Sequence, residues 1–289
     1  MIAIILHESY TLANGVQIPK LGLGTWMIPD EQADEAVRQA VALGYRLIDT
    51  AQAYGNEAGV GRGARSCAIK REALFITSKV AAENKTYASA AQSIDESLRK
   101  MGLDYLDLMI IHSPQPWAEF RSEKRYFDEN REGWRALEDA YKAGKLRAIG
   151  VSNFLTDDLE SLLAACEVRP MVNQILTHIA NTPLELIDFC EKNSILCEAY
   201  SPIAHGEALK NAAVARMAQG YGVTPAQLCV RYTLQLGMVS LPKTGNPAHM
   251  QANAAVDFEI SSADMETLKR IDKIKDYGEY SFFPVFSGK

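Results

Sequence analysis

Residues 21–49 read LGLGTWMIPDEQADEAVRQAVALGYRLID and contain a complete strand–helix–strand unit. The apolar run Leu21–Thr25 indicates a short strand, and a helix is predicted over Asp30–Leu43, with Asp30 as its expected N-cap. The helix has an apolar face and stops before a glycine. The run Tyr45–Asp49 then predicts a second strand, parallel to the first because a helix connects the two.

The same alternation continues along the chain. Further strands are predicted at residues 74–78, 106–111, 147–151, 171–174, 195–200 and 238–242. Helical patterns pass through Val60 and Ala64 and cover residues 88–101, 130–143, 157–166, 183–192, 207–219, 225–236, 247–255 and 262–274. Eight strand–helix units without a linker rich in Pro, Gly or Ser favour an α/β fold, a closed (β/α)8 TIM barrel, over an open sheet. Residues 1–289 are therefore expected to form a single domain.

Two segments lie outside this alternation. In Tyr10–Ile18, the dipeptide Asn14-Gly15 stands between apolar residues and predicts a β-hairpin, which we expect to cap the N-terminal end of the barrel. Residues 276–289 contain aromatic side chains without a period. They are expected to pack on the domain surface near the active-site mouth.

Composition excludes several classes of function. The chain has 36 Asp and Glu against 30 Lys and Arg, a net charge of −6, which argues against general nucleic-acid binding. No apolar run reaches the ~18 residues that a membrane-spanning helix needs, and the first apolar run is too short for a signal peptide. Five cysteines without a C-x-x-C pair indicate reduced thiols in a cytoplasmic protein. The five histidines are scattered, and no metal site is assigned.

Ionisable side chains stand at the ends of successive predicted strands. Asp49 ends the second strand, Lys79 follows the third, His112 follows the fourth, and Tyr54 lies in the loop after Asp49. Each residue alone is explained by an ion pair or by packing. Because the carboxyl ends of barrel strands form the active site, the four together favour a catalytic cluster.

These residue types suit the protonation of an oxygen. A free phenol has a pKa of ~10, so we expect Lys79 to lower the pKa of Tyr54, Asp49 to hold Lys79, and His112 to orient a substrate carbonyl. No activated Ser or Cys and no paired carboxylate is visible. The nucleophile is therefore expected to be a cofactor hydride.

Seven sequence motifs resemble the signature of the aldo-keto reductase family. They are Gly44–Ala51, Tyr54–Glu57, Val60-Gly61, Ile149–Phe154, Asn173-Gln174, Tyr200–Pro202 and Leu241–Thr244. The matches run in family order from Gly22 to Asn253. The resemblance implies a metal-free, monomeric barrel that reduces carbonyls with NADPH and uses Asp49, Tyr54, Lys79 and His112 as its catalytic tetrad.

The resemblance also implies a cofactor site. Ser152, Asn153 and Gln174 would bind the nicotinamide carboxamide, and Tyr200 would stack on the ring, as donors, acceptors and an aromatic face require. Taken alone, Ser152-Asn153 fits a helix N-cap equally well. The remaining residues implied at the cofactor are Gly24, Thr25, Asp49, Ser201 and Ile203 along the tunnel, Lys243, Thr244 and Asn246 at the adenosine phosphate, and Asn253 at the adenine.

One position departs from the family pattern. Where the family usually has an Arg that clamps the 2′-phosphate of NADPH, this chain has His249. A guanidinium is permanently charged and bidentate, and an imidazole is neither. We therefore expect a weaker, pH-sensitive preference for NADPH, with some use of NADH.

The segment Gly59–Ala64 contains G-x-G-x-x-A, the fingerprint of dinucleotide binding in open sheets. That fingerprint must directly follow a strand, but here it begins ten residues after Asp49 and inside a helical pattern. Close packing of a helix through small residues explains it better.

The substrate is less well defined by the sequence. Trp26, Trp117 and Phe282, together with Phe283 and Phe286, are predicted walls of an apolar pocket. The short segment 203–207 resembles microbial, diketogluconate-reductase-like members and suggests an open site for small aldehydes and ketones. Two alternatives remain: a redox sensor that binds cofactor with little turnover, and an isomerase or lyase that uses Lys79 as a Schiff base.

Overall fold

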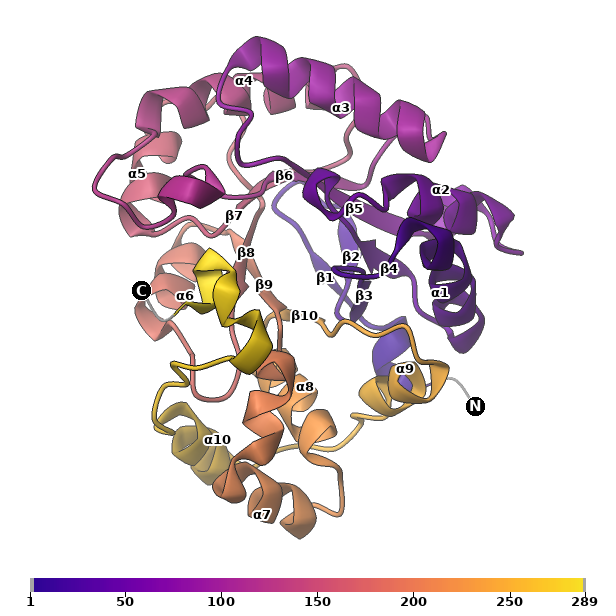
Figure 1. The fold of residues 1–289 in the computed structure, drawn as a ribbon, viewed down its shortest axis with the longest axis vertical. Helices are drawn as coiled ribbons and strands as arrows, with labels where there is room; N and C mark the ends of the chain where they lie inside the picture. Colours follow the sequence, from indigo (N-terminus) through magenta and orange to yellow (C-terminus); the bar gives the residue numbers. More distant parts are fainter. Residues whose placement is uncertain (1–2, 288–289) are drawn as a thin grey trace.

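The computed structural model describes residues 3–287, which form a barrel of strands surrounded by helices (Figure 1). Its strands are β1 Ser9–Thr11, β2 Gln17–Pro19, β3 Gly22–Gly24, β4 Leu47–Asp49, β5 Phe75–Val80, β6 Leu108–Ile111, β7 Ile149–Ser152, β8 Val172–Leu176, β9 Leu196–Tyr200 and β10 Val239–Leu241. Its α-helices are α1 Asp30–Leu43, α2 Glu57–Ser66, α3 Tyr87–Met101, α4 Phe127–Lys142, α5 Thr156–Leu163, α6 Leu184–Lys192, α7 Ala212–Gly220, α8 Pro225–Gln235, α9 Pro247–Ala254 and α10 Ser262–Lys269.

Strands β3 to β10 are parallel and follow one another around the sheet in chain order. The ring closes between β10 and β3, where the Ser240 N–H donates to Lys20 O at 2.9 Å and the Gly24 N–H donates to Pro242 O at 3.1 Å. Nearly all strand residues are buried, because helices cover the outside and side chains fill the inside. The predicted (β/α)8 barrel is confirmed.

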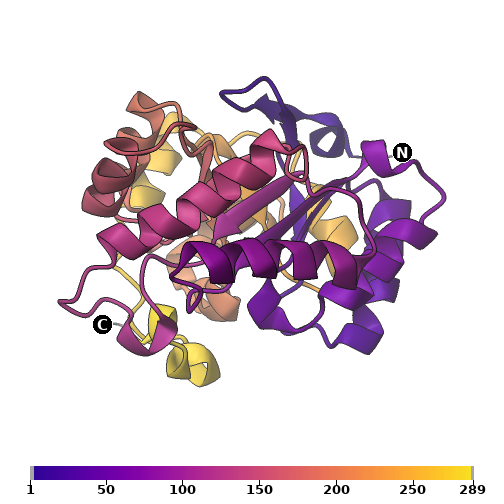
Figure 2. The same cartoon turned by 90° about the horizontal axis from the view of Figure 1, so that it is seen from above.

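The predicted N-terminal hairpin is present as β1 and β2, paired antiparallel with Tyr10 opposite Ile18. Gly15 occupies the turn with φ +87°, a conformation that glycine adopts without strain. The Asn14 side chain donates to Arg147 O at 2.9 Å, just before β7 begins. The hairpin therefore closes the end of the barrel at which the strands begin, opposite the C-terminal segment (Figure 2).

Helix α2 packs against its neighbours through glycines. A Cβ on Gly59 would lie 2.2 Å from Asp30 O, and a Cβ on Gly61 would lie 2.2 Å from Met101 O. Both acceptors belong to the backbone of adjacent helices, α1 and α3, so neither contact tolerates a side chain. This confirms that the G-x-G-x-x-A segment serves helix packing.

Three local expectations are wrong. Asp30 is not the N-cap of α1, because Pro29 holds that position and the Asp30 carboxylate accepts from the Gly59 N–H at 2.6 Å. The predicted helix 207–219 is divided, because Asn211 is extended and caps a new helix, α7, by accepting from the Ala213 N–H. Helix α10 ends at Lys269, five residues early, after which the Ile274 N–H donates to Ala180 O.

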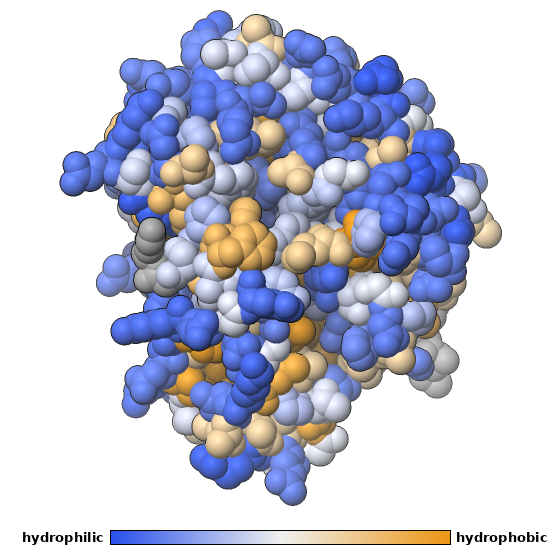
Figure 3. Space-filling model, in the orientation of Figure 1, coloured by the Kyte–Doolittle hydropathy of each residue, from blue (hydrophilic) through white to orange (hydrophobic). Residues whose placement is uncertain are grey.

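The C-terminal segment, residues 277–287, forms two short 3-10 turns over the mouth of the barrel (yellow in Figure 1). Its side chains Tyr277 and Phe286 are each only 3% exposed and belong to a second apolar core with α7, α8 and α10. Apolar side chains also gather on the surface at the centre of this face (orange in Figure 3). None of the helices in residues 3–287 is both long and apolar enough to span a membrane.

Candidate active site

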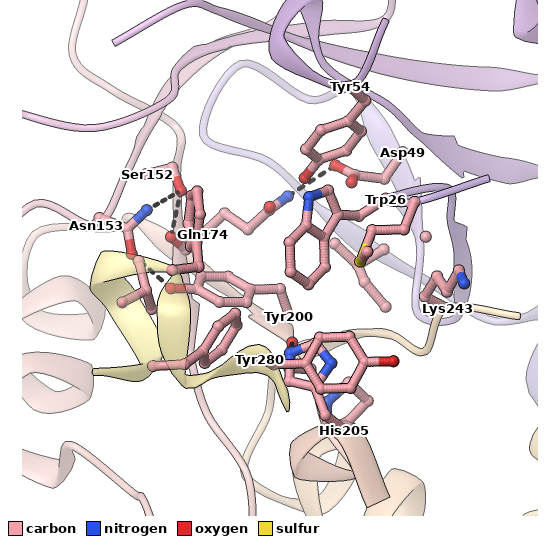
Figure 4. A pocket seen from close by; sticks show the side chains of 18 of the residues that line it. Trp26, Asp49, Tyr54, Ser152, Asn153, Gln174, Tyr200, His205, Lys243 and Tyr280 are labelled. Atoms are coloured by element: carbon pink, nitrogen blue, oxygen red, sulfur yellow. Dashed lines mark hydrogen bonds between the residues drawn. The ribbon is translucent and has the colours of Figure 1, made fainter. Parts of the chain in front are cut away.

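A cavity of about 240 Å³ opens at the C-terminal ends of the barrel strands. Its floor holds three of the four predicted tetrad residues, Asp49, Tyr54 and His112, and the fourth, Lys79, lies fully buried beneath them. The polar side chains Ser152, Asn153 and Gln174 form one wall (Figure 4). The structure therefore brings together groups that lie up to 125 residues apart in the sequence.

Lys79 is the centre of the tetrad. Its Nζ contacts the two carboxylate oxygens of Asp49 at 2.8 and 2.7 Å, and it also donates to Thr50 O at 2.8 Å. The Tyr54 hydroxyl lies 3.3 Å from the same Nζ. Because Asp49 lies at the end of β4 and Lys79 near the end of β5, adjacent parallel strands bring the two charges together.

Burial sets the protonation of the two groups that face the cavity. Burial, and then the charge of Asp49, raise the pKa of the Tyr54 phenol well above its ordinary value. Contrary to the expectation from the sequence, the Tyr54 pKa is therefore not lowered overall, because burial, and then the charge of Asp49, outweigh the ammonium of Lys79 that lies 3.3 Å away. Burial, and then Lys79, hold the pKa of His112 well below 6.5. At neutral pH the phenol and the imidazole are both uncharged.

The polar wall is itself hydrogen-bonded. The Ser152 hydroxyl donates to Gln174 O at 2.8 Å, and the Tyr200 hydroxyl donates to Asn153 Oδ1 at 2.7 Å. The Asn153 amide group donates to His112 O at 3.0 Å, which connects this wall to the tetrad. Three buried amide or hydroxyl side chains beside the ring of Tyr200 fit a flat ring that carries a carboxamide.

Aromatic side chains close the opposite side of the cavity. Trp117 lies between His112 and Phe283, with ring centroids 5.1 and 4.9 Å away. Trp26 packs against Phe283 and Phe286 at 5.7 and 5.9 Å. The C-terminal segment therefore forms part of the cavity wall.

Comparison with known proteins agrees with the fold and with this arrangement of side chains. The model of the "Aldo/keto reductase family" matches residues 20–273. The chain belongs to the aldo/keto reductase family.

Relatives of this family match nearly the whole chain. The Bacillus subtilis protein named "Uncharacterized oxidoreductase YtbE" is 42% identical over 94% of each chain. A Bacillus subtilis glyoxal reductase is 40% identical over 94% of this chain and 96% of that protein. Among solved structures, a Bombyx mori aldo-keto reductase in complex with NADP has a TM-score of 0.85 and 28% identity, and covers 96% of this chain and 98% of its own.

Not every residue expected from the aldo/keto reductase pattern lines the cavity. Gly24, Ser201, Ile203 and Lys243 do, as do Trp26 and Trp117. Thr25 does not, because it is fully buried and its hydroxyl donates to Asp49 O at 2.9 Å. The cavity does not extend to Thr244, Asn246, His249 and Asn253, which lie in and before α9, so their contact with a cofactor stays a prediction.

The prediction that Phe282 belongs to the wall of the cavity is wrong. Phe282 is 72% exposed and does not line the cavity, whereas Phe283 and Phe286 do. Neighbouring side chains of a 3-10 turn leave its axis in different directions, so one aromatic of the segment faces solvent and the others face inward.

Sequence reasoning missed two residues in and behind this site. His205 lies in left-handed backbone with φ +54°, stacks on Tyr280 at 4.2 Å, and lines the cavity. Nothing in the local sequence indicates that backbone. Glu198 lies inside the barrel on β9, fully buried. For Glu198 the sequence did contain a signal. A carboxylate in the apolar run 195–200 is unfavourable on a helix-covered strand unless hydrogen-bond or ionic partners compensate its burial.

Proposed function

We propose that this aldo/keto reductase transfers hydride from NADPH to aldehydes or ketones and releases the alcohol. One observation carries the proposal: a neutral phenol, Tyr54, faces the cavity beside His112 while an ammonium lies 3.3 Å behind its oxygen. This arrangement suits the donation of a proton to a carbonyl oxygen.

The roles of the tetrad follow from its contacts. Tyr54 is the general acid, because it lines the cavity and carries its proton at neutral pH. Lys79 then stabilises the negative oxygen that remains on Tyr54, and Asp49 keeps the ammonium in position. His112, neutral at this pH, orients the carbonyl by a hydrogen bond. The hydride itself is supplied by NADPH when it is bound.

Three observations support NADPH as the cofactor. The relative from Bombyx mori was crystallised with NADP. Ser152, Asn153 and Gln174 would bind the carboxamide of its nicotinamide, with Tyr200 against the ring. Lys243 lines the far side of the cavity (Figure 4) and would meet the adenosine phosphate together with Thr244 and Asn246.

For the substrate, we propose small aldehydes and ketones. The glyoxal reductase of Bacillus subtilis, a relative at 40% identity, supports this range. The aromatic side chains that line the cavity also favour a partly apolar carbonyl compound.

The alternative activities fit the contacts less well. A Schiff base needs a free, uncharged amine, but the Lys79 Nζ is fully buried and held by Asp49 and Thr50. A redox sensor needs no general acid, so it would leave the Tyr54 arrangement without a purpose. Within residues 3–287, no cluster of His, Cys, Asp and Glu is arranged to hold a metal ion.

Further expectations complete the proposal. The chain acts as a single domain and a monomer in the cytoplasm, without a nucleic-acid or membrane partner. The net charge of −6 supports the absence of a nucleic-acid partner, and the five free cysteines support the cytoplasmic location.

Replacement of Tyr54 by Phe tests the general acid. We expect Tyr54→Phe to lower kcat for NADPH-dependent reduction by roughly 100-fold or more, because the proton donor is lost, while NADPH binding measured by fluorescence quenching is retained. The matched control is Tyr45→Phe, which also removes a buried hydroxyl, but one that donates to Met250 O outside the cavity. Retained turnover in Tyr54→Phe would disprove the assignment.

A further inference from the structure

Glu198 is a fully buried carboxyl that has no part in the roles given above. It lies on β9, inside the barrel, and its register partner on β8 is Gln174. Gln174 in turn lines the cavity, and Glu198 lies behind it. A lone buried carboxylate is unfavourable, so its presence requires an account from its contacts.

The Gln174 amide joins Glu198 to the tetrad. Its Nε2 donates to Glu198 Oε2 at 2.8 Å and to Asp49 Oδ1 at 2.9 Å. Both protons of this amide group are thereby engaged, one by each carboxyl. Since the amide cannot turn without losing both bonds, its carbonyl oxygen has a fixed direction. Glu198 and Asp49 therefore hold Gln174 between them.

The charges at this place do not balance. Two carboxyls, Asp49 and Glu198, lie near a single ammonium, Lys79, whose contacts go to Asp49, Thr50 and Tyr54 and not to Glu198. The Glu198 Oε1 atom is buried and has no hydrogen-bond partner in the part of the chain that the structure describes. A neutral carboxyl tolerates such an atom better than a carboxylate does.

The electrostatics agree with this geometry. Burial, and then the charge of Asp49, raise the pKa of Glu198 to about 7, against the opposing effects of the Gln174 hydrogen bond and Lys79. Cys197 is a titratable neighbour on the same strand. A hydrogen bond with Cys190, and then burial, raise the pKa of its thiol, so the thiol stays neutral.

We propose that Glu198 is a positioning residue of the tetrad: it holds Gln174 together with Asp49, and its negative charge, when present, slows carbonyl reduction. This inference rests on the proposed function for its kinetic part only. When Tyr54 gives up its proton, negative charge develops on the phenol oxygen. An ionised Glu198 adds a second negative charge beside Asp49 and opposes that step, whereas a protonated Glu198 does not.

The first test needs no cofactor and no turnover. Between pH 4.5 and 7 the folded protein holds a proton on Glu198 that the unfolded chain releases, so this group stabilises the fold at low pH, and its contribution is lost as the pH rises through 7. As the pH rises from 4.5 to 7, loss of this contribution should raise the unfolding equilibrium constant of the wild type on the order of 100-fold. Glu198→Gln should not show this rise. The control Glu191→Gln removes an exposed carboxyl from α6 and should follow the wild type.

The second test uses the wild type alone and does not depend on how the variant folds. Infrared difference spectra of the cofactor-free protein should show a buried protonated carboxyl that disappears with a midpoint near pH 7. Absence of this band, or identical pH dependence of stability in wild type and Glu198→Gln, would overturn the proposal.

The kinetic test separates this inference from the proposed function. We expect the ratio of kcat at pH 6 to kcat at pH 8.5 for reduction to be severalfold larger in the wild type than in Glu198→Gln. Equal ratios would refute the effect of the Glu198 charge on reduction. If no carbonyl compound were reduced at all, the proposed function would fail, and the stability and infrared tests would still decide whether Glu198 titrates.

Discussion

At the scale of single residues, Tyr54 shows how a site can favour proton donation without a lowered pKa. Its neighbours form an ion pair, so the ammonium of Lys79 acts on the phenol as one half of a neutral couple. Burial then dominates, and the phenol stays protonated at neutral pH. The ammonium matters at the moment of transfer, when it lies 3.3 Å from an oxygen that is becoming negative.

His249 is the residue on which cofactor choice is expected to depend. It is exposed in the first turn of α9, close to the Asn246 cap. We expect His249→Arg to raise the ratio of kcat/KM for NADPH over NADH by about tenfold, because a guanidinium forms a charge-assisted, bidentate contact with a phosphate.

The measurement is steady-state kinetics with both cofactors at pH 6 and pH 8. The wild type should favour NADPH less strongly than His249→Arg at both pH values, because an imidazole does not offer the bidentate contact of a guanidinium. His7→Arg, which adds the same charge to an exposed residue before β1, should leave the ratio unchanged. A wild type that discriminates as well as His249→Arg at both pH values would contradict this prediction.

At the scale of elements, strand ends determine most of the site. The alternation of apolar runs and helices places Asp49 and Lys79 on adjacent parallel strands, so their contact could be predicted from the sequence. The direction in which the Tyr54 pKa shifts could not be predicted, because it depends on how deeply the groups are buried and on which charges cancel. The left-handed backbone at His205 is likewise set by tertiary contacts rather than by local residues.

Helix α2 provides a prediction at this scale. In Gly61→Ala the new methyl group would meet backbone atoms of Met101 at 2.2 and 2.4 Å, so α2 and α3 would have to separate. We expect a loss of about 2 kcal/mol in the free energy of unfolding, measured with urea. Gly220→Ala, where nothing lies within 4 Å, is the matched control and should be neutral or slightly stabilising. Equal stability of the two variants would show that the close approach is not required.

At the scale of the whole molecule, the cavity is built from both ends of the chain. Trp26 follows β3, and it contacts Phe283 and Phe286, which follow all eight barrel strands. The sequence shows that these aromatics exist, but it gives no period from which to choose those that face inward. That choice depends on how the two 3-10 turns meet the mouth of the barrel.

Two phenylalanines test this arrangement. We expect Phe286→Ala to lower stability by about 3 kcal/mol and to reduce kcat/KM for apolar aldehydes, because the side chain is 3% exposed and contacts His205 at 4.4 Å. Phe282→Ala removes an equal side chain that is 72% exposed, and it should change neither quantity. Thermal unfolding and steady-state kinetics of the two variants provide the comparison, and a larger effect in Phe282→Ala would reverse the assignment of the wall.

The place of the C-terminal segment has a consequence for biosynthesis. Chains emerge from the ribosome from the N-terminus, so the four tetrad residues and all eight barrel strands are made before residues 277–287. The proton-transfer residues can thus be assembled while one side of the cavity is still missing. A protease that cuts within this segment would leave the tetrad in place beside an open cavity, and such a nicked enzyme would lose discrimination among substrates before it lost its chemistry.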